Sequence, residues 1–253
     1  MESVRLRTVI TDELMQEARF QFWKCELFGI SRIVPDEVCP NKMSGTSQIT
    51  KPNLRAKIVV VGRSGVGKTS IILRYDGQGF CSKVSPTLGA SFISSLLHLG
   101  GKNVELQIWD TAGQERYSSM LPMYLRNAVA AVIVYDITDR ESFHEIKKWV
   151  NEVERGSTVP VSLFLVGNKL DLESCRAVQH QEGAQYAEQI GAAFHETSAV
   201  NGEGIHKVIV AVAEHLLERQ NGEENARSMQ LDAISNFDLF NDHKVKKPCC
   251  FRG

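Results

Sequence analysis

The residues with the clearest chemistry in this chain run from Gly62 to Thr69 and read GRSGVGKT. They follow an apolar run of strand length, AKIVVV, and precede a helical stretch that begins SIILR. Glycine lets backbone N–H groups turn toward phosphate oxygens, and the N-terminus of the next helix adds unpaired N–H groups and a positive dipole end. In this arrangement the Lys68 ammonium reaches the β- and γ-phosphates, and the Thr69 hydroxyl binds Mg²⁺. The flanking strand and helix favour a nucleotide-phosphate site over an ordinary glycine-containing turn. The predicted phosphate-binding residues are Ser64, Gly65, Val66, Gly67, Lys68, Thr69 and Ser70.

A second polar sequence, DTAGQE, begins at Asp110 directly after another predicted strand. An aspartate at a strand end can hold the shell of a Mg²⁺ ion, usually through water, and so complete the site begun by Thr69. Gly113 permits the backbone to approach a γ-phosphate, and Gln114 can orient a water for in-line attack. An aspartate and a glycine at this spacing are often only a turn. In a chain that also carries the phosphate loop, the sequence indicates nucleotide hydrolysis.

A third polar loop, Asn168 to Asp171, follows the fifth predicted strand. A carboxylate at Asp171 can accept two hydrogen bonds from the N1–H and exocyclic amine of guanine, whereas adenine offers no matching pair of donors. The stem of Lys169 can lie along the base, and the Asn168 amide can tie this loop to the phosphate loop. An ordinary polar loop is the weaker interpretation here. The nucleotide is therefore predicted to be guanine.

The elements that must position these loops alternate between strand and helix from residue 53 onward. Strands are predicted at 57–61, 91–99, 104–109, 131–136, 162–166 and 193–196. Helices are predicted near 70–75, 116–125, 140–155, 179–190 and 204–219. A Gly-Gly-Lys-Asn turn at 100–103 makes the second and third strands a hairpin, and the apolar central strands indicate a sheet covered on both faces. The predicted fold is α/β, a doubly wound, mostly parallel six-stranded sheet with one antiparallel edge strand. In such folds, ligands bind beyond the carboxyl ends of the strands.

Composition and charge restrict the class of protein. The chain of 253 residues is 43% hydrophobic and 23% charged, so it can bury an ordinary core. A formal net charge of −1 gives no reason to expect a nucleic-acid partner. Six scattered cysteines without a C-x-x-C pair suit a reducing compartment. No apolar run approaches the ~20 residues of a membrane span, no signal peptide is expected, and the histidines lack metal-ligand spacing.

Three regions are predicted along the chain. Residues 1–52 form an N-terminal extension that is partly helical or disordered, since an acidic helix start near Asp12 is followed by a linker rich in Pro, Ser and Gly. Residues 53–220 form the nucleotide-binding domain, and residues 221–253 form a flexible polar tail. No function is assigned to the N-terminal extension.

These motifs together resemble a Ras-superfamily small GTPase over roughly residues 54–219. Residues 135–138 (YDIT), 109–117 (WDTAGQERY) and 87–92 (TLGASF) are specifically similar to the Rab family. The last of these, with Gly100-Gly101-Lys102, resembles the early-endosomal branch of that family. The resemblance implies a GTP-binding G domain that hydrolyses GTP to GDP and phosphate with Mg²⁺.

The resemblance also implies roles for individual residues. Thr87 matches the threonine that binds Mg²⁺ when a γ-phosphate is present, and with Gln114 and Lys68 it belongs to the expected catalytic set. Phe80 matches an aromatic residue placed against the guanine, and Ser198 and Ala199 match the loop whose backbone contacts the guanine carbonyl. The implied metal ligands are Thr69, Thr87 and Asp110. The implied effector-binding residues are Phe92, Trp109 and Tyr124. Without the resemblance, the sequence fits equally well with these three being core or partly buried aromatic residues.

Several positions depart from the family pattern. Val200 stands where the family usually has a lysine, which weakens the expected packing on the base. Leu125 and Asn127 replace the usual tyrosine and glycine. Gln114 is retained, so the chemistry is expected to be intact but slow without an activating protein, since no arginine in the chain is an obvious internal arginine finger.

The last residues of the chain are basic and contain a cysteine pair, which three further residues, Phe251-Arg252-Gly253, follow. Lys244, Lys246 and Lys247 precede Pro248, Cys249 and Cys250. The pair resembles the Rab double-cysteine ending, which implies two geranylgeranyl groups and anchoring by two lipid chains. Each lysine adds about 1 kcal/mol near an anionic leaflet. The alternative is an unmodified tail.

The leading hypothesis is a membrane-anchored GTP/GDP switch on the cytoplasmic face of endomembranes, at early endosomes, that cycles with the cytosol. By resemblance its partners are an exchange factor, a GTPase-activating protein, effectors in vesicle transport, and a dissociation inhibitor or escort protein. A second hypothesis is a GTP-binding scaffold that scarcely hydrolyses or cycles, motivated by Val200, the changes after Tyr124 and the N-terminal extension. A nucleotide kinase ranks far below, because it leaves Asn168 and Asp171 unexplained.

Overall fold

The computed structural model describes residues 51–81, 87, 89–113 and 120–241, with residues 225–241 described by their backbone alone. Nearly all of the predicted N-terminal extension therefore lies outside the described residues. So do Gln114 and the cysteine pair, Cys249 and Cys250.

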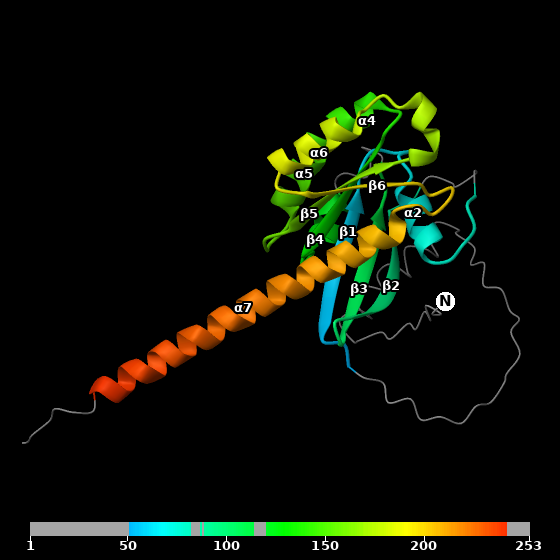
Figure 1. Cartoon of the computed structure of the whole chain (residues 1–253). Helices are drawn as coiled ribbons and strands as arrows, with labels where there is room; N and C mark the ends of the chain where they lie inside the picture. Colours follow the sequence, from blue (N-terminus) through cyan, green and yellow to red (C-terminus); the bar gives the residue numbers. More distant parts are fainter. Residues whose placement is uncertain (1–50, 82–86, 88, 114–119, 242–253) are drawn as a thin grey trace, which may run out of the picture.

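A single six-stranded sheet organises the described chain, with the strand order β2-β3-β1-β4-β5-β6 (Figure 1). The hairpin pair β2 and β3 is antiparallel, and the other pairs are parallel. The strands are β1 (Leu54–Val61), β2 (Ala90–Leu99), β3 (Lys102–Thr111), β4 (Ala130–Asp136), β5 (Ser162–Asn168) and β6 (Ala193–Thr197). The predicted fold class is confirmed, and each predicted strand lies inside an observed one.

Helices cover both faces of the sheet, and β1 shows how one strand serves two cores. Ile58 and Val60 belong to the core that includes residues of α2 (Lys68–Tyr75) and α7 (Ile205–Asn241). Val59 and Val61 belong to the opposite core, with α3 (Leu121–Leu125), α5 (Ile146–Gly156) and α6 (His180–Gln189). Successive side chains of a strand point to opposite faces, so burial on both sides requires an uninterrupted apolar run.

The predicted helix at 140–155 is divided into α4 (Arg140–His144) and α5. Asp139 caps α4, because its carboxylate accepts a hydrogen bond from the Glu141 N–H at 3.0 Å. Glu145 lies at the division, and its carbonyl accepts from the N–H groups of both Lys148 and Trp149. Such shared bonds are common where one helix ends and another begins.

Part of the predicted helix at 116–125 is confirmed, and its first residues lie outside the described ones. α3 starts at Leu121, with Pro122 in its first turn, where the missing N–H of proline costs no hydrogen bond. Residues 114–119 lie outside the described residues.

α7 is longer than predicted: the helix was expected to end near Arg219 but continues to Asn241. The sequence from 220 to 241 contains no proline and many strong helix formers, which explains the continuation. α7 contacts the sheet domain at Asn221, whose side chain accepts a hydrogen bond from Lys102 Nζ at 2.6 Å, and the helix runs on beyond the sheet (Figure 1). The predicted tail is therefore helical from residue 221 to Asn241, the last described residue, and its predicted flexibility stays a prediction. Among the described helices, α7 included, none has the length and apolar composition needed to cross a membrane.

Candidate nucleotide-binding site

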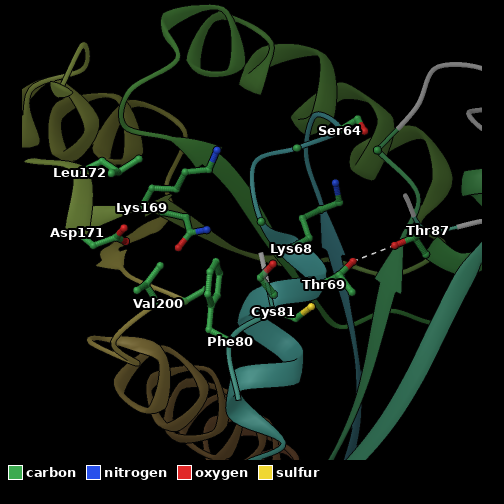
Figure 2. Close-up of a pocket in the computed structure, with 16 residues that line it drawn as sticks. Ser64, Lys68, Thr69, Phe80, Cys81, Thr87, Lys169, Asp171, Leu172 and Val200 are labelled. Atoms are coloured by element: carbon green, nitrogen blue, oxygen red, sulfur yellow. Dashed lines mark hydrogen bonds between the residues drawn. The ribbon is translucent and has the colours of Figure 1, made fainter. Parts of the chain in front are cut away.

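A cavity of about 410 Å³ opens beyond the carboxyl ends of the parallel strands. Figure 2 shows Ser64, Lys68, Thr69 and Thr87 toward one end, and Lys169, Asp171, Leu172 and Val200 toward the other, with Phe80 near that second group. The lining residues are Ser64, Gly65, Gly67, Lys68, Thr69, Ser70, Phe80, Cys81, Thr87, Gly113, Asn168, Lys169, Asp171, Leu172, Ala199 and Val200. The volume suits a small molecule such as a nucleotide.

Two of the predicted nucleotide-binding residues, Val66 and Ser198, do not line this cavity. Both are almost completely buried, at 1% and 0% exposure. Val66 accepts a hydrogen bond at its carbonyl from Asn168 Nδ2 at 2.8 Å, and Ser198 donates through Oγ to Asp171 Oδ1 at 2.5 Å. Through these hydrogen bonds, Val66 and Ser198 hold the lining residues Asn168 and Asp171 in position.

The glycine-rich loop reaches α2 through backbone that favours glycine. Gly67 caps α2 with a φ of 96°, in the left-handed region. A Cβ atom at Gly67 would collide with the amide nitrogen of Asn168. The two loops can therefore meet only because residue 67 has no side chain.

Lys68 is a buried cation at the phosphate end of the cavity. Its side chain is only 5% exposed, and Nζ donates to the carbonyls of Gly62 at 2.8 Å and Arg63 at 2.9 Å. Burial lowers the pKa of Lys68 to about 8, while the nearby Asp110 carboxylate opposes that shift. An anion placed beside Nζ would favour the charged ammonium.

Three side-chain oxygens converge on one point beside Lys68. Thr69 Oγ1 donates to Asp110 Oδ2 at 2.6 Å, and the hydroxyls of Thr69 and Thr87 lie 2.8 Å apart. Asp110 is 1% exposed; burial raises the pKa of its carboxyl, and the hydrogen bond from Thr69 and the charge of Lys68 oppose that shift. Within the described part of the chain, Asp110 Oδ1 has no hydrogen-bond partner.

This set of oxygens fits Mg²⁺, which prefers hydroxyl, carboxylate and water oxygens over nitrogen or sulfur. The described residues contain no alternative cluster of three or more His, Cys, Asp or Glu side chains that could hold a metal ion. Thr69, Thr87 and Asp110 are therefore the residues that would hold the ion. When bound there, Mg²⁺ neutralises negative charge on phosphate oxygens.

Gly113 lines the same end of the cavity immediately after β3. A Cβ atom at residue 113 would collide with Lys68 Nζ and with the backbone of Gly62 and Arg63. The close approach allows the backbone after β3 to reach the phosphate end.

The opposite end of the cavity is held together by hydrogen bonds between two loops. Asn168 is 1% exposed, and its Oδ1 accepts a bond from Thr197 Oγ1 at 3.1 Å. The Ser198–Asp171 bond joins the same two loops a few residues further on. Lys169 adopts a left-handed φ of 71° and forms an ion pair with Asp136 at 2.5 Å. Asp171 thus belongs to a loop whose position is held by hydrogen bonds and an ion pair.

Three exposed apolar side chains lie at this end of the cavity. Phe80, Leu172 and Val200 are 46%, 41% and 44% exposed, and all line it. Their faces suit an aromatic base, which the neighbouring polar groups can contact at its edge. Leu172 and Cys81 also line the cavity and were not predicted from the sequence, although they adjoin the predicted residues Asp171 and Phe80.

The three predicted effector-binding aromatics lie together outside the cavity. The ring centroids of Phe92 and Trp109 are 5.3 Å apart, and those of Trp109 and Tyr124 are 5.9 Å apart. Phe92 is 41% exposed, whereas Tyr124 is 4% exposed. Of the three, Phe92 offers a partner the most surface.

The fold and the cavity define a phosphate-loop, nucleotide-binding α/β domain. Residues 57–218 match the family model described as "Ras family", and the chain belongs to that family. A Rab-21 of Geodia cydonium is 43% identical over 175 residues, which cover 69% of this chain and 76% of that protein. The human Rab-21 is 43% identical over 171 residues (68% and 76%), and a mouse Rab-17 is 40% identical over 199 residues (78% and 91%).

The chain is therefore a Rab-like small GTPase, a GTP hydrolase involved in vesicle trafficking. Members of the Ras family bind GTP or GDP together with Mg²⁺ and work through regulators and effectors. The scaffold without hydrolysis is not favoured by these relationships.

Proposed function

We propose that this chain is a membrane-anchored GTP/GDP switch whose nucleotide lies along the cavity, with its phosphates at Lys68 and its guanine at Asp171. One observation carries the proposal: a single cavity is lined at one end by a buried ammonium and at the other by a carboxylate beside exposed apolar side chains. The anionic and aromatic parts of a nucleotide match these two ends in order.

At the phosphate end, hydrolysis depends on positioning and electrostatics. The Lys68 ammonium and the backbone N–H groups of Gly65 and Gly67 bind the phosphates, and the buried surroundings strengthen these contacts. Gln114, outside the described residues, orients the attacking water. Thr87 and the backbone of Gly113 bind at the γ-phosphate, so the segments that carry them respond to its loss.

At the base end, the Asp171 carboxylate accepts the N1–H and the exocyclic amine of guanine. Phe80 packs on one face of the base, and the backbone at Ser198 and Ala199 contacts its carbonyl oxygen. Ser198 Oγ holds Asp171 in orientation before the base arrives, which reduces the entropy lost on binding.

The outputs of the switch are effector and membrane binding. Phe92 on β2, Trp109 on β3 and Tyr124 on α3 together form the effector surface. Cys249 and Cys250 carry geranylgeranyl groups and, with the nearby lysines, hold the protein on the cytoplasmic face of early endosomes. An exchange factor, a GTPase-activating protein and an escort protein control its cycle.

The first test identifies the nucleotide released from freshly purified, denatured protein, beside an Asp171→Asn variant. We expect GDP or GTP from the unmodified protein, and a weaker preference for guanine over other purines in the variant. Adenine nucleotide, or an unchanged preference in Asp171→Asn, would contradict the proposed role of Asp171.

A second test measures single-turnover GTP hydrolysis in the unmodified protein and in Gln114→Leu. We expect slow hydrolysis that the substitution abolishes. Equal rates in the two proteins would show that Gln114 has no catalytic role.

A further inference from the structure

Arg176 lies between the two loops that meet at the base end of the cavity, although it does not line the cavity itself. It directly follows η2 (Leu170–Cys175), the short 3₁₀ helix that contains Asp171. Its side chain is only 7% exposed. A buried guanidinium is uncommon and requires a full set of acceptors.

One set of acceptors belongs to β6. Arg176 Nη1 and Nη2 donate to the two carboxylate oxygens of Glu196, at 2.6 and 3.1 Å. Glu196 is itself only 9% exposed and immediately precedes Thr197 and Ser198. The forked pair therefore anchors the end of β6 from which Thr197 and Ser198 contact Asn168 and Asp171.

A second set belongs to η2 itself. Arg176 Nε lies 2.9 Å from both carboxylate oxygens of Glu173, and Nη2 lies 2.6 Å from Oε2. The Arg176 backbone N–H also donates to the Glu173 carbonyl at 3.1 Å. The same guanidinium thus contacts the segment of Asp171 and the strand of Ser198.

We propose that Arg176 is a positioning residue for guanine recognition, which sets the distance between the η2 segment and the end of β6 and so aligns Asp171 with Ser198 and Ala199. This inference rests on the proposed function, because it assumes that Asp171 contacts the base. Arg176 acts through these residues and does not touch the nucleotide.

The geometry makes this role sensitive to substitution. A guanidinium is planar, so two forked contacts to Glu196 and Glu173 fix both its position and its plane. Without it, the Glu196 carboxylate would be left buried and unpaired, a state that favours movement of the side chain toward water.

The Arg140–Glu182 pair serves as a control, with more exposed side chains, at 48% and 35%. Arg140 also makes a forked contact to a carboxylate, at 2.8 and 3.1 Å, and donates to a backbone carbonyl, that of Ala177. The pair joins α4 to α6, and neither residue lines the cavity. Its removal tests the loss of an ion pair without the loss of this alignment.

The experiment compares release of fluorescent GDP and fluorescent IDP from the full chain in Mg²⁺ after excess unlabelled GDP is added. IDP lacks the 2-amino group of guanine, from which the Asp171 carboxylate would accept a hydrogen bond. The unmodified protein should release IDP about 10- to 100-fold faster than GDP, as expected for one hydrogen bond to a charged group. The variants are Arg176→Ala, Arg176→Lys, Arg140→Ala and Asp171→Asn, and each is checked by thermal unfolding in its GDP-bound form.

Arg176→Ala should release GDP about tenfold faster while IDP changes less, so the IDP/GDP ratio should fall about threefold or more. Arg176→Lys, which keeps the charge but not the fork, should give an intermediate ratio and guards against misfolding of the alanine variant. Arg140→Ala should keep the unmodified ratio.

Any of four results would overturn the proposal. Equal acceleration of both nucleotides in Arg176→Ala and in Arg176→Lys would mean that Arg176 is only structural. A ratio lowered equally by Arg140→Ala would mean the same. If Asp171→Asn kept the ratio, the proposed contact of Asp171 with guanine would fail and this inference with it; if Asp171→Asn lowered the ratio and Arg176→Ala did not, only the positioning role would be wrong.

Discussion

The two ends of the cavity are built on opposite physical principles. At the phosphate end, the ionisable groups Lys68 and Asp110 are almost fully buried. Burial lowers the pKa of Lys68 and raises the pKa of Asp110, so it favours the neutral form of each group. At the base end, Phe80, Leu172 and Val200 are apolar but more than two-fifths exposed. Each end is thus matched to a ligand of the complementary kind.

The difference indicates which end supplies affinity and which supplies selectivity. A buried cation gains most from a polyanion, because electrostatic interactions strengthen where water is excluded. Hydrogen bonds join Ser198 to Asp171 and Thr197 to Asn168 at the base end. The acceptors there are therefore held in fixed positions, and they select among bases by whether a base places its donors to match. We expect substitutions at the phosphate end to weaken binding of every nucleotide, and those at the base end to act less strongly.

The largest effect is expected from Lys68→Ala. Loss of the ammonium removes charge-assisted hydrogen bonds to the phosphates, so the affinity for GDP should fall by about 100-fold or more. Isothermal titration of the nucleotide-free protein would measure it, with the exposed Lys207→Ala on α7 as control. A loss below about fivefold would contradict the strength assigned to the phosphate end.

The next effect concerns Mg²⁺. Chelation of the ion should accelerate GDP release about tenfold or more, because the charge on the phosphates is then less well neutralised. In Asp110→Asn, which keeps the shape of the side chain but not its charge, release should be fast with or without Mg²⁺. A full response to Mg²⁺ in this variant would refute the assignment of the ion site.

A smaller effect is expected from Phe80→Ala at the base end. Stacking of an aromatic side chain on a base contributes roughly 1–3 kcal/mol. Phe80 is 46% exposed, so we expect the low end of that range and an acceleration of GDP release of about fivefold. The response to Mg²⁺ should remain, since the phosphate end is unchanged. Leu96→Ala, at an equally exposed residue of β2 outside the cavity, is the control and should not change release.

The smallest effect is expected from Val200→Lys. A lysine stem covers more apolar surface than valine while its charged end stays in water, so GDP release should slow by about two- to fivefold. Stopped-flow fluorescence can resolve this difference. Faster release in the variant would indicate that the valine is the better fit to this cavity.

Much of the fold was predictable because burial on both faces of a sheet demands continuous apolar strands. Each predicted strand begins and ends within a few residues of the observed one, as for 131–136 and β4. The division at Glu145 and the continuation of α7 beyond Arg219 were not predicted. Both depend on backbone hydrogen bonding and helix propensity over many residues, which periodicity alone does not reveal.

The candidate site was predictable where local backbone demands particular residue types. Glycines beside Lys68 and Thr69, and polar residues after a strand, carry a signal within a few positions. Support from behind the lining residues carries no such signal. The structure makes Val66 and Ser198 buried partners of Asn168 and Asp171, while their contact with the nucleotide stays a prediction. Arg176 and Glu196 are 20 positions apart in the sequence, and nothing in their spacing predicts an ion pair.

By itself, the sequence determined the order of strands and helices, the phosphate loop and the family resemblance, because these depend on residue type and short spacing. Only the tertiary structure decided which side chains share the cavity, how far each is buried, and which carboxylates have partners. Burial and hydrogen bonding set the pKa of Lys68 and the orientation of Asp171, and they arise where strands distant in sequence end at the same edge of one sheet.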